Sequence, residues 1–293
     1  MMTKQHDTLG FIGIGLMGKP LVLRLLAGGF KVNVWNRSPE KLNSVIEAGA
    51  IACESIAELA NNSQVIILCL ADTAVVSQIV ENDILSSGAR DKLIIDLSSI
   101  HPETTRQLAA KLKKQSNIDW VDAPVSGGTL GAEQGTLAIM AGGTAENIEI
   151  ARQVLAPLYK QLTHMGEIGS GQVTKICNQM IVSCNVLVIA EMMKLAQQAG
   201  VEAEKIPQAL AGGFADSKPL QIVAPQMATA TFEPIKWRVK TLLKDLNMAV
   251  EVAGKHGTAI PMSGLAAQLM QLHGSHGFLD QDPATLIKLF EAE

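Results

Sequence analysis

A glycine-rich turn follows the first apolar run of this chain and limits what the chain can fold into. Gly13, Gly15 and Gly18 have the spacing G-x-G-x-x-G, between a strand-like run at residues 9–14 and a helix opened by Pro20. The first glycine permits a tight turn, the second lets a pyrophosphate approach the backbone, and the third lets the helix pack closely on the strand. This context predicts a dinucleotide-binding turn, with an ordinary strand-to-helix turn as the alternative. The turn comprises Gly13, Ile14, Gly15, Leu16, Met17 and Gly18.

Short runs rich in Ile, Val and Leu alternate with helical segments along the first half of the chain. The predicted strands are residues 9–14, 31–35, 65–70, 93–97 and 118–122, with two more at 136–141 and 161–165. The predicted helices between them are residues 20–27, 39–48, 73–80 and 102–113. Because the strands are apolar on both faces, this alternation predicts an α/β fold with a doubly wound parallel sheet covered by helices on both sides.

After Gly166 the pattern changes to helices alone. Residues 172–200 contain no strong helix breaker and have apolar residues at mixed spacings of three and four, which predicts a long helix buried on most sides. Further helices are predicted at 206–211, 242–255, 262–273 and 283–292. A chain of 293 residues usually has two domains. We predict a dinucleotide-binding domain at residues 1–167 and an all-α domain for substrate binding and dimerisation at residues 168–293.

The residues at the end of the second predicted strand indicate which dinucleotide binds. An NAD-binding protein usually has Asp or Glu there, whereas this chain has Asn36, Arg37 and Ser38. A guanidinium binds a 2′-phosphate in a bidentate fork, and the two neighbouring side chains add donors. The segment therefore favours NADP(H), with NAD(H) still possible; the alternative is that Arg37 is a solvated loop charge.

Composition excludes several classes of function. Lys and Arg total 24 against 28 Asp and Glu, a formal charge of −4, whereas nucleic-acid-binding proteins normally have a basic surplus. Four cysteines without a C-x-x-C pair do not form a disulfide framework. Residues 1–8 are polar without a signal-peptide pattern, and the most apolar run, residues 181–190, is shorter than the ~20 residues that span a bilayer. We expect a cytoplasmic protein without nucleic-acid or membrane partners.

Two further segments combine small and polar residues. Ser126, Gly127 and Gly128 follow a predicted strand and bring a hydroxyl and two amides close together, which suits a carboxylate, although a plain turn has the same composition. Lys175 and the pair Asn178 and Gln179 are spaced i, i+3 and i+4, so they share one face of an otherwise apolar helix. Burial lowers the pKa of a lysine and suits it to proton exchange near neutral pH. The alternative is a lysine whose charged end reaches solvent.

Together these segments resemble the β-hydroxyacid dehydrogenase family, which includes 3-hydroxyisobutyrate dehydrogenase, tartronate semialdehyde reductase and glyoxylate/succinic semialdehyde reductase. The resemblance covers nearly the whole chain, and several motifs in the same order are more specific than any one of them. Leu70-Ala71-Asp72 departs from the family's common Leu-Pro-Asp. The other matching segments are Asp96-Leu97-Ser98-Ser99-Ile100, Gly135-Thr136-Leu137, Gly142-Gly143 and Lys244-Asp245-Leu246.

The resemblance implies an N-terminal Rossmann domain joined by a long interdomain helix to an all-α domain like that of 6-phosphogluconate dehydrogenase, assembled as a homodimer or homotetramer. It implies that Lys175 is the catalytic residue. The implied substrate-binding residues are Ser126, Gly127, Gly128, Asn178 and Gln179, with the choice between the last two open. The implied cofactor contacts are Leu70, Ala71, Ser99 near the nicotinamide, and Lys244, which closes over the cofactor.

The activity that the resemblance implies is hydride transfer between NADP(H) and a small β-hydroxy acid or semialdehyde carboxylate, with Lys175 as general acid and base. Trp237 and residues near Phe214 and Phe232 are candidates for shaping the substrate pocket. No metal is expected, because His273-Gly274-Ser275-His276 is typical of a glycine-rich loop.

The sequence leaves two alternatives open. One is a reductase of another carbonyl or of an imine, and Lys175 argues against the imine type because enzymes of that type usually replace the lysine. The other is a dinucleotide-binding protein without turnover. Retention of both Lys175 and the loop at residues 126–128 argues against it.

Overall fold

The computed structural model describes residues 8–291, so predictions about residues 1–7 and 292–293 lie outside the described residues. The chain divides into two compact units, one ending at Lys175 and the other beginning at Ile176. Each unit has a hydrophobic core of its own. The division falls inside a continuous helix, eight residues after the boundary at residue 167 expected from the sequence.

The first unit is built on a nine-stranded sheet with the order β3-β2-β1-β4-β5-β6-β8-β7, with β9 paired to β8. The first six strands in this order, from β3 through β2, β1, β4 and β5 to β6, are parallel to one another. Strand β8 is antiparallel to β6 and β7 and parallel to β9. The strand order reverses between β1 and β4, as in doubly wound dinucleotide-binding folds. The predicted fold class is therefore confirmed. The strands are β1 (Thr8–Ile12), β2 (Lys31–Trp35), β3 (Ile51–Ala52), β4 (Val65–Leu68), β5 (Leu93–Asp96), β6 (Asp119–Asp122), β7 (Val125–Ser126), β8 (Leu137–Gly142) and β9 (Tyr159–Gly166).

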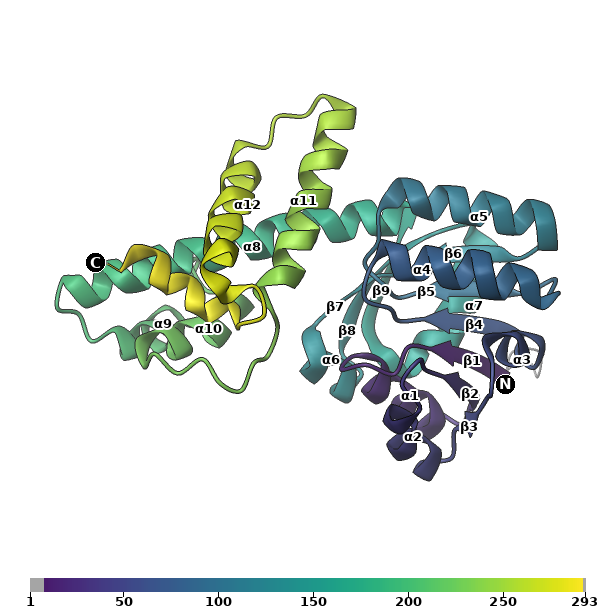
Figure 1. Ribbon diagram of the computed structural model, residues 1–293. Helices are drawn as coiled ribbons and strands as arrows, with labels where there is room; N and C mark the ends of the chain where they lie inside the picture. The colour runs from purple at the N-terminus through teal and green to yellow at the C-terminus, as the bar shows by residue number, and fades with distance from the viewer. Residues whose placement is uncertain (1–7, 292–293) are drawn as a thin grey trace. The chain divides into compact units, whose positions relative to one another are not determined.

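Helices cover both faces of this sheet (Figure 1). One face packs against α1 (Gly18–Ala27) and α7 (Ala145–Leu155), and the other packs against α3 (Ile56–Asn61), α4 (Thr73–Gln78) and α5 (Pro102–Ser116). The remaining helical segments are η1 (Pro39–Leu42), α2 (Asn43–Glu47), the π-helical η2 (Ile79–Ile84), η3 (Leu85–Ser87), α6 (Gly128–Gln134) and η4 (Ala156–Leu158).

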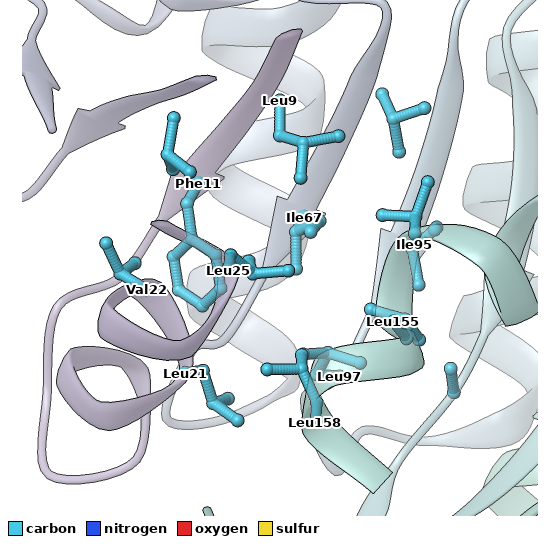
Figure 2. Close-up of a cluster of buried hydrophobic side chains, with 14 of the residues drawn as sticks. Leu9, Phe11, Leu21, Val22, Leu25, Ile67, Ile95, Leu97, Leu155 and Leu158 are labelled. Atoms are coloured by element: carbon cyan, nitrogen blue, oxygen red, sulfur yellow. The ribbon is translucent and has the colours of Figure 1, made fainter. Parts of the chain in front are cut away.

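The central strands are apolar at every position because their alternate side chains enter two different cores. Phe11 of β1 packs toward α1, where Figure 2 shows it between Val22 and Leu25, while the adjacent Ile12 joins the core on the opposite face. Ile67 of β4 repeats the pattern, with its two neighbours in the second core. A strand buried on both faces is typical of a parallel sheet.

The second unit is all helical among the residues that the structure describes, as the sequence predicts. Its core is formed by α8, α10, α11 and α12 together with the C-terminal segment η7. The last of these is a 3₁₀ segment where an α-helix was expected. The elements are α8 (Ser170–Gln198), η5 (Ala203–Lys205), α9 (Ile206–Leu210), α10 (Lys218–Ala228), α11 (Val239–His256), α12 (Pro261–His273), η6 (Gly274–Phe278) and η7 (Pro283–Phe290).

Six of the strands and α-helices were not predicted from the sequence. The strands β3 and β7 have two residues each, too few to show a period. Glycines lower the helix propensity of α6, and Pro225 lies inside α10. Helices α3 and α7 did carry a signal, because the side chains of Ser55 and Thr144 cap their first turns.

Helix α8 requires a correction to the expectation about apolar segments. The helix has 29 residues and contains an 18-residue window of mean hydropathy 1.5, so by length and composition alone it is long enough to cross a membrane. The sequence analysis compared only residues 181–190 with the length of a membrane span, whereas the helix that contains this run extends well beyond it on both sides. However, Val186, Leu187, Ala190 and Met193 are buried in the core of the second unit, so α8 is a core helix.

Candidate functional site

The glycine-rich turn leaves β1 at the point where the strand order reverses. Gly13 has φ +107°, and a Cβ atom there would overlap the Cys69 carbonyl oxygen that follows β4. A Cβ at Gly18 would overlap the Gly13 carbonyl. In contrast, a Cβ at Gly15 would meet no atom within 4 Å. Two glycines are therefore required by close packing, whereas the middle one leaves the backbone open, which fits a pyrophosphate at this turn.

At the end of β2, the Asn36 side chain supports the glycine-rich turn. Its Oδ1 accepts from the Ile14 amide at 2.9 Å, and its Nδ2 donates to the Ser38 carbonyl at 2.9 Å. Arg37 between them is exposed. All three residues are predicted cofactor contacts. The supporting role of Asn36 was not predicted, because a partner 22 residues away leaves no local signal in the sequence.

The carboxyl ends of β4 and β5 are joined by Ser98. Its Oγ accepts from the Leu70 amide at 2.9 Å, and its own amide donates to Asp96 Oδ1 at 2.9 Å. Ser99 is half-buried and Ala71 is exposed. The predicted cofactor residues Leu70, Ala71 and Ser99 therefore lie at the same edge of the sheet as the glycine-rich turn.

The carboxylate of Asp122, the last residue of β6, holds the first turn of α8. Its Oδ1 accepts from the Gly169 amide at 2.7 Å, and its Oδ2 accepts from the Gln172 amide at 2.9 Å. Asp122 is fully buried, and desolvation raises its pKa to about 6 against the lowering effect of these backbone hydrogen bonds. A carboxylate at a helix N-terminus also interacts favourably with the positive end of the helix dipole. Asp122 therefore fixes where α8 begins.

Gln172 makes a second connection between α8 and the sheet. Its Nε2 donates to the Ser98 carbonyl at 2.8 Å, and its Oε1 accepts from the Ile100 amide at 3.1 Å. One buried side chain thus bonds the backbone on both sides of Ser99. Lys175, half-buried, follows in the same helix three residues later. Asp122 and Gln172 thereby hold the first turn of the helix that carries Lys175 at the carboxyl ends of β5 and β6.

The predicted substrate loop lies between β7 and α6. Ser126 pairs with Ala138 of β8 and is half-buried, while Gly127 and Gly128 are exposed with φ +140° and +63°. These left-handed conformations favour glycine over other residues. A Cβ at Gly127 would also press on the Leu137 side chain. The loop needs both glycines to turn from strand to helix, and this turn exposes its backbone.

In the second unit, three of the predicted site residues share one hydrogen-bonded group. Asn178 donates to Gln179, which donates to Asp245, and Lys244 lies 3.4 Å from the same carboxylate. Lys244 and the amide pair were predicted site residues, whereas Asp245 had no predicted role. Its position in the Lys244-Asp245-Leu246 motif was the available signal.

The candidates for shaping the pocket differ in their surroundings. The Phe214 side chain is fully exposed, and the Phe232 ring lies under Lys288 with its centroid 5.2 Å from Nζ. Trp237 has a buried indole N–H without a hydrogen-bond partner among the described residues. The role of all three residues in shaping the pocket stays a prediction.

His273 packs as a core side chain. Its ring stacks on Phe278 with centroids 4.4 Å apart, and its Nε2 lies 2.9 Å from Thr285 Oγ1. Burial, helped by the nearby positive charges of His276 and Lys288, lowers its pKa to about 4. Within residues 8–291, no cluster of three or more His, Cys, Asp or Glu side chains is placed to hold a metal ion.

Comparison with known protein families identifies the family to which this chain belongs. Residues 8–166 match the NAD-binding domain of 6-phosphogluconate dehydrogenase, and residues 169–290 match a domain described as NAD-binding of NADP-dependent 3-hydroxyisobutyrate dehydrogenase. The chain belongs to the β-hydroxyacid dehydrogenase family. The family resemblance of the motifs is thereby confirmed, and the chain is an NAD(P)-dependent oxidoreductase of hydroxy acids.

Individual relatives of this β-hydroxyacid dehydrogenase match over nearly its whole length. It is 32% identical over 285 residues to the 2-hydroxy-3-oxopropionate reductase of Escherichia coli (strain K12), covering 97% of each chain. Its fold is similar to that of Mycobacterium tuberculosis 3-hydroxyisobutyrate dehydrogenase with L-serine, with a TM-score of 0.87, 27% identity and coverage of 98% of this chain and 100% of that one. It is also similar to Psf3 in complex with NADP+ and 2-OPP, with a TM-score of 0.88, 26% identity and coverage of 97% and 100%.

Proposed function

We propose that this β-hydroxyacid dehydrogenase transfers a hydride between NADP(H) and a small β-hydroxy acid or semialdehyde carboxylate, with Lys175 as general acid and base. The observation that carries the proposal is the double attachment of the α8 N-terminus. Asp122 and Gln172 bind the first turn of the helix to the carboxyl ends of the strands, next to Ser99. The crevice beyond that edge is where dinucleotide-binding sheets bind their ligands.

The proposed mechanism follows the movement of charge. When bound, the nicotinamide supplies the hydride in reduction and accepts it in oxidation. As the aldehyde carbon becomes tetrahedral, negative charge develops on its oxygen, and the Lys175 ammonium stabilises that charge and donates its proton to give the alcohol. In oxidation the neutral amine takes the proton from the hydroxyl. The hydroxyl of Ser126 and the amides of Gly127 and Gly128 bind the substrate carboxylate and so orient the reacting carbon.

Substrate class can be tested by following NADPH oxidation with glyoxylate, succinic semialdehyde, tartronate semialdehyde and methylmalonate semialdehyde. The names of the relatives support this choice, because 2-hydroxy-3-oxopropionate and L-serine are small carboxylates with oxygen at the β-carbon. Propanal, which has the aldehyde without the carboxylate, is the matched control. We expect turnover with at least one carboxylate and much slower turnover with propanal; equal rates would contradict the proposed carboxylate loop.

Arg37 is expected to set the preference for NADPH, because an exposed guanidinium at the end of β2 can bind a 2′-phosphate. Arg37→Ala should weaken NADPH binding by roughly 1–3 kcal/mol and NADH binding much less, as measured by fluorescence titration. Arg90→Ala, which also removes an exposed arginine, is the control and should leave both affinities unchanged. Equal binding of the two cofactors by the unmodified enzyme would show that this assignment is wrong.

We also propose a homodimer or homotetramer formed through the second unit. An apolar stripe on α8 is exposed at Ile181 (71%), Val188 (52%) and Leu195 (68%), which repeat every seven residues along one face. Cys184 on α8 contacts Ser263 at 3.8 Å, and the α12 residues Met262 and Leu265 beside it are exposed too. An apolar surface of this kind is typical of a protein–protein interface.

The oligomer proposal predicts that charge on the stripe disrupts assembly. Val188→Glu combined with Leu195→Glu should lower the mass measured by light scattering after gel filtration to that of a single chain, because burying two carboxylates in an interface is unfavourable. Ile46→Glu, at an exposed apolar residue of the first unit, is the control and should leave the mass unchanged. A single-chain mass for the unmodified protein would contradict the proposal.

A cytoplasmic location is part of the same proposal. All four cysteines are free thiols, as in a reducing compartment. The apolar helix α8 serves the core of the second unit. Both features fit an enzyme that works in the cytoplasm.

A further inference from the structure

Arg24, in the last turn of α1, bonds two backbone carbonyls that belong to other segments of the first unit. Its Nε donates to the Pro157 carbonyl of η4 at 2.6 Å, and its Nη1 donates to the Glu133 carbonyl in the last turn of α6 at 3.0 Å. Gly135, which follows α6, lies against the same guanidinium, because a Cβ there would come within 2.4 Å of Nε and 2.5 Å of Cζ and Nη2. Arg24 therefore attaches the C-terminal end of α6 to α1.

Helix α6 needs such an attachment because it is a weak helix by itself. It has seven residues, of which Gly128 and Gly131 disfavour helix, and a helix this short is not stable in isolation. The last carbonyls of a helix have no partners within it. Arg24 bonds one of these carbonyls and places a positive charge at the negative end of the helix dipole. The conformation of α6 therefore depends on its surroundings, and Arg24 supports its C-terminal end.

The other end of α6 is the loop at residues 126–128. Gly127 is the residue before the helix and Gly128 is its first residue, so the loop and the helix share backbone. They also pack on one side chain, because a Cβ at Gly127 or at Gly131 would lie 2.9 or 3.0 Å from the Leu137 side chain. Seven residues of helix span only about 10 Å. A change at the C-terminal end of α6 therefore reaches the loop.

We propose that Arg24 is a positioning residue, which holds residues 126–128 in the conformation that binds the substrate carboxylate. This rests on the proposed function. The glycine-rich turn at the start of α1 does not need Arg24 in the same way, because Leu21, Val22 and Leu25 fix α1 in the core of the first unit. Removal of the guanidinium should therefore affect the substrate carboxylate and spare the cofactor.

Arg24→Met tests this role because it keeps a long side chain and removes every donor. The KM for the best of the four carboxylate substrates should rise by at least about tenfold, the effect of losing one good hydrogen bond to the carboxylate. The kcat/KM for propanal and the affinity for NADPH should stay within about twofold, since neither depends on the loop. General damage to the fold would lower all three together.

Arg24→Lys should restore most of the function. The nitrogen of a lysine lies about where the guanidinium carbon of an arginine lies, and its three donors allow it to bond both carbonyls. We expect a KM within about threefold of that of the unmodified enzyme. Arg152→Met is the matched control, because Arg152 of α7 also donates to a backbone carbonyl of the first unit, that of Leu162 at 2.7 Å. It should leave the KM unchanged.

Amide hydrogen exchange, measured by mass spectrometry, is a readout independent of turnover. In Arg24→Met, exchange in residues 127–135 should be faster by at least about tenfold, while exchange in α5 stays unchanged. If no carboxylate is turned over but exchange changes in this way, the proposed function fails and the attachment of α6 by Arg24 stands. The inference would be overturned by unchanged exchange in residues 127–135, by an unchanged KM in Arg24→Met, by an equal loss with propanal, or by Arg24→Lys as impaired as Arg24→Met.

Discussion

Replacing Lys175 by alanine should lower turnover by at least about 100-fold while NADPH still binds. The loss is expected because no other group would donate the proton as charge develops on the substrate oxygen. The glycine-rich turn and Arg37, which are proposed to hold the cofactor, are untouched by the change. The measurements are kcat from NADPH oxidation and the NADPH affinity from fluorescence titration of the same preparation.

Two further variants separate proton transfer from positive charge and from helix stability. Lys175→Arg keeps the charge but should not rescue turnover, because a guanidinium does not release its proton near neutral pH. Lys194→Ala removes a lysine from the same helix and should leave kcat close to that of the unmodified enzyme. A kcat for Lys175→Ala within a few fold of the original would refute the acid–base role.

Asp122 should make the stability of the protein depend on pH in a defined window. Burial raises its pKa to about 6, above the usual 3.8, so between these values the folded state binds more protons at this group than the unfolded state does. Its contribution to the free energy of unfolding is therefore largest below about pH 4 and falls as the pH rises through 6. The fall amounts to about 3 kcal/mol, from a shift of about two pKa units.

Asp122→Asn isolates this contribution because its side chain does not titrate. The free energy of unfolding of the original protein minus that of the variant, from urea titrations at about pH 4 to 7.5, should decrease between about pH 4 and 6 and then level off. Asp119→Asn on the same strand is the control: it removes a carboxylate that pairs with Lys113 at the surface, and should leave the free energy of unfolding close to that of the original protein. A difference that stays constant, or that rises with pH, would contradict the burial of an ionised Asp122.

The sequence predicted most of the elements that place the candidate site. β2 was predicted with the limits found, because its apolar run is bounded by turn-forming residues, and α8 was predicted to within two residues at each end. The requirement for glycine at residues 13 and 18 also followed from spacing. In contrast, Asp122 and Gln172 had no predicted role as anchors of α8. Their partners are 47 to 74 residues away, and no local pattern reports such a distance.

By itself, the sequence determined the alternation of strands and helices, the glycine-rich turn, the change to an all-helical second half and the family. These are local properties, since periodicity and turn chemistry act within a few residues. Only the tertiary structure decided which buried acid holds the start of α8, and which amide group Asp245 turns toward itself on Gln179. Those choices depend on strand order and on desolvation, because a carboxylate buried away from water must take its hydrogen bonds from whatever donors the fold brings to it.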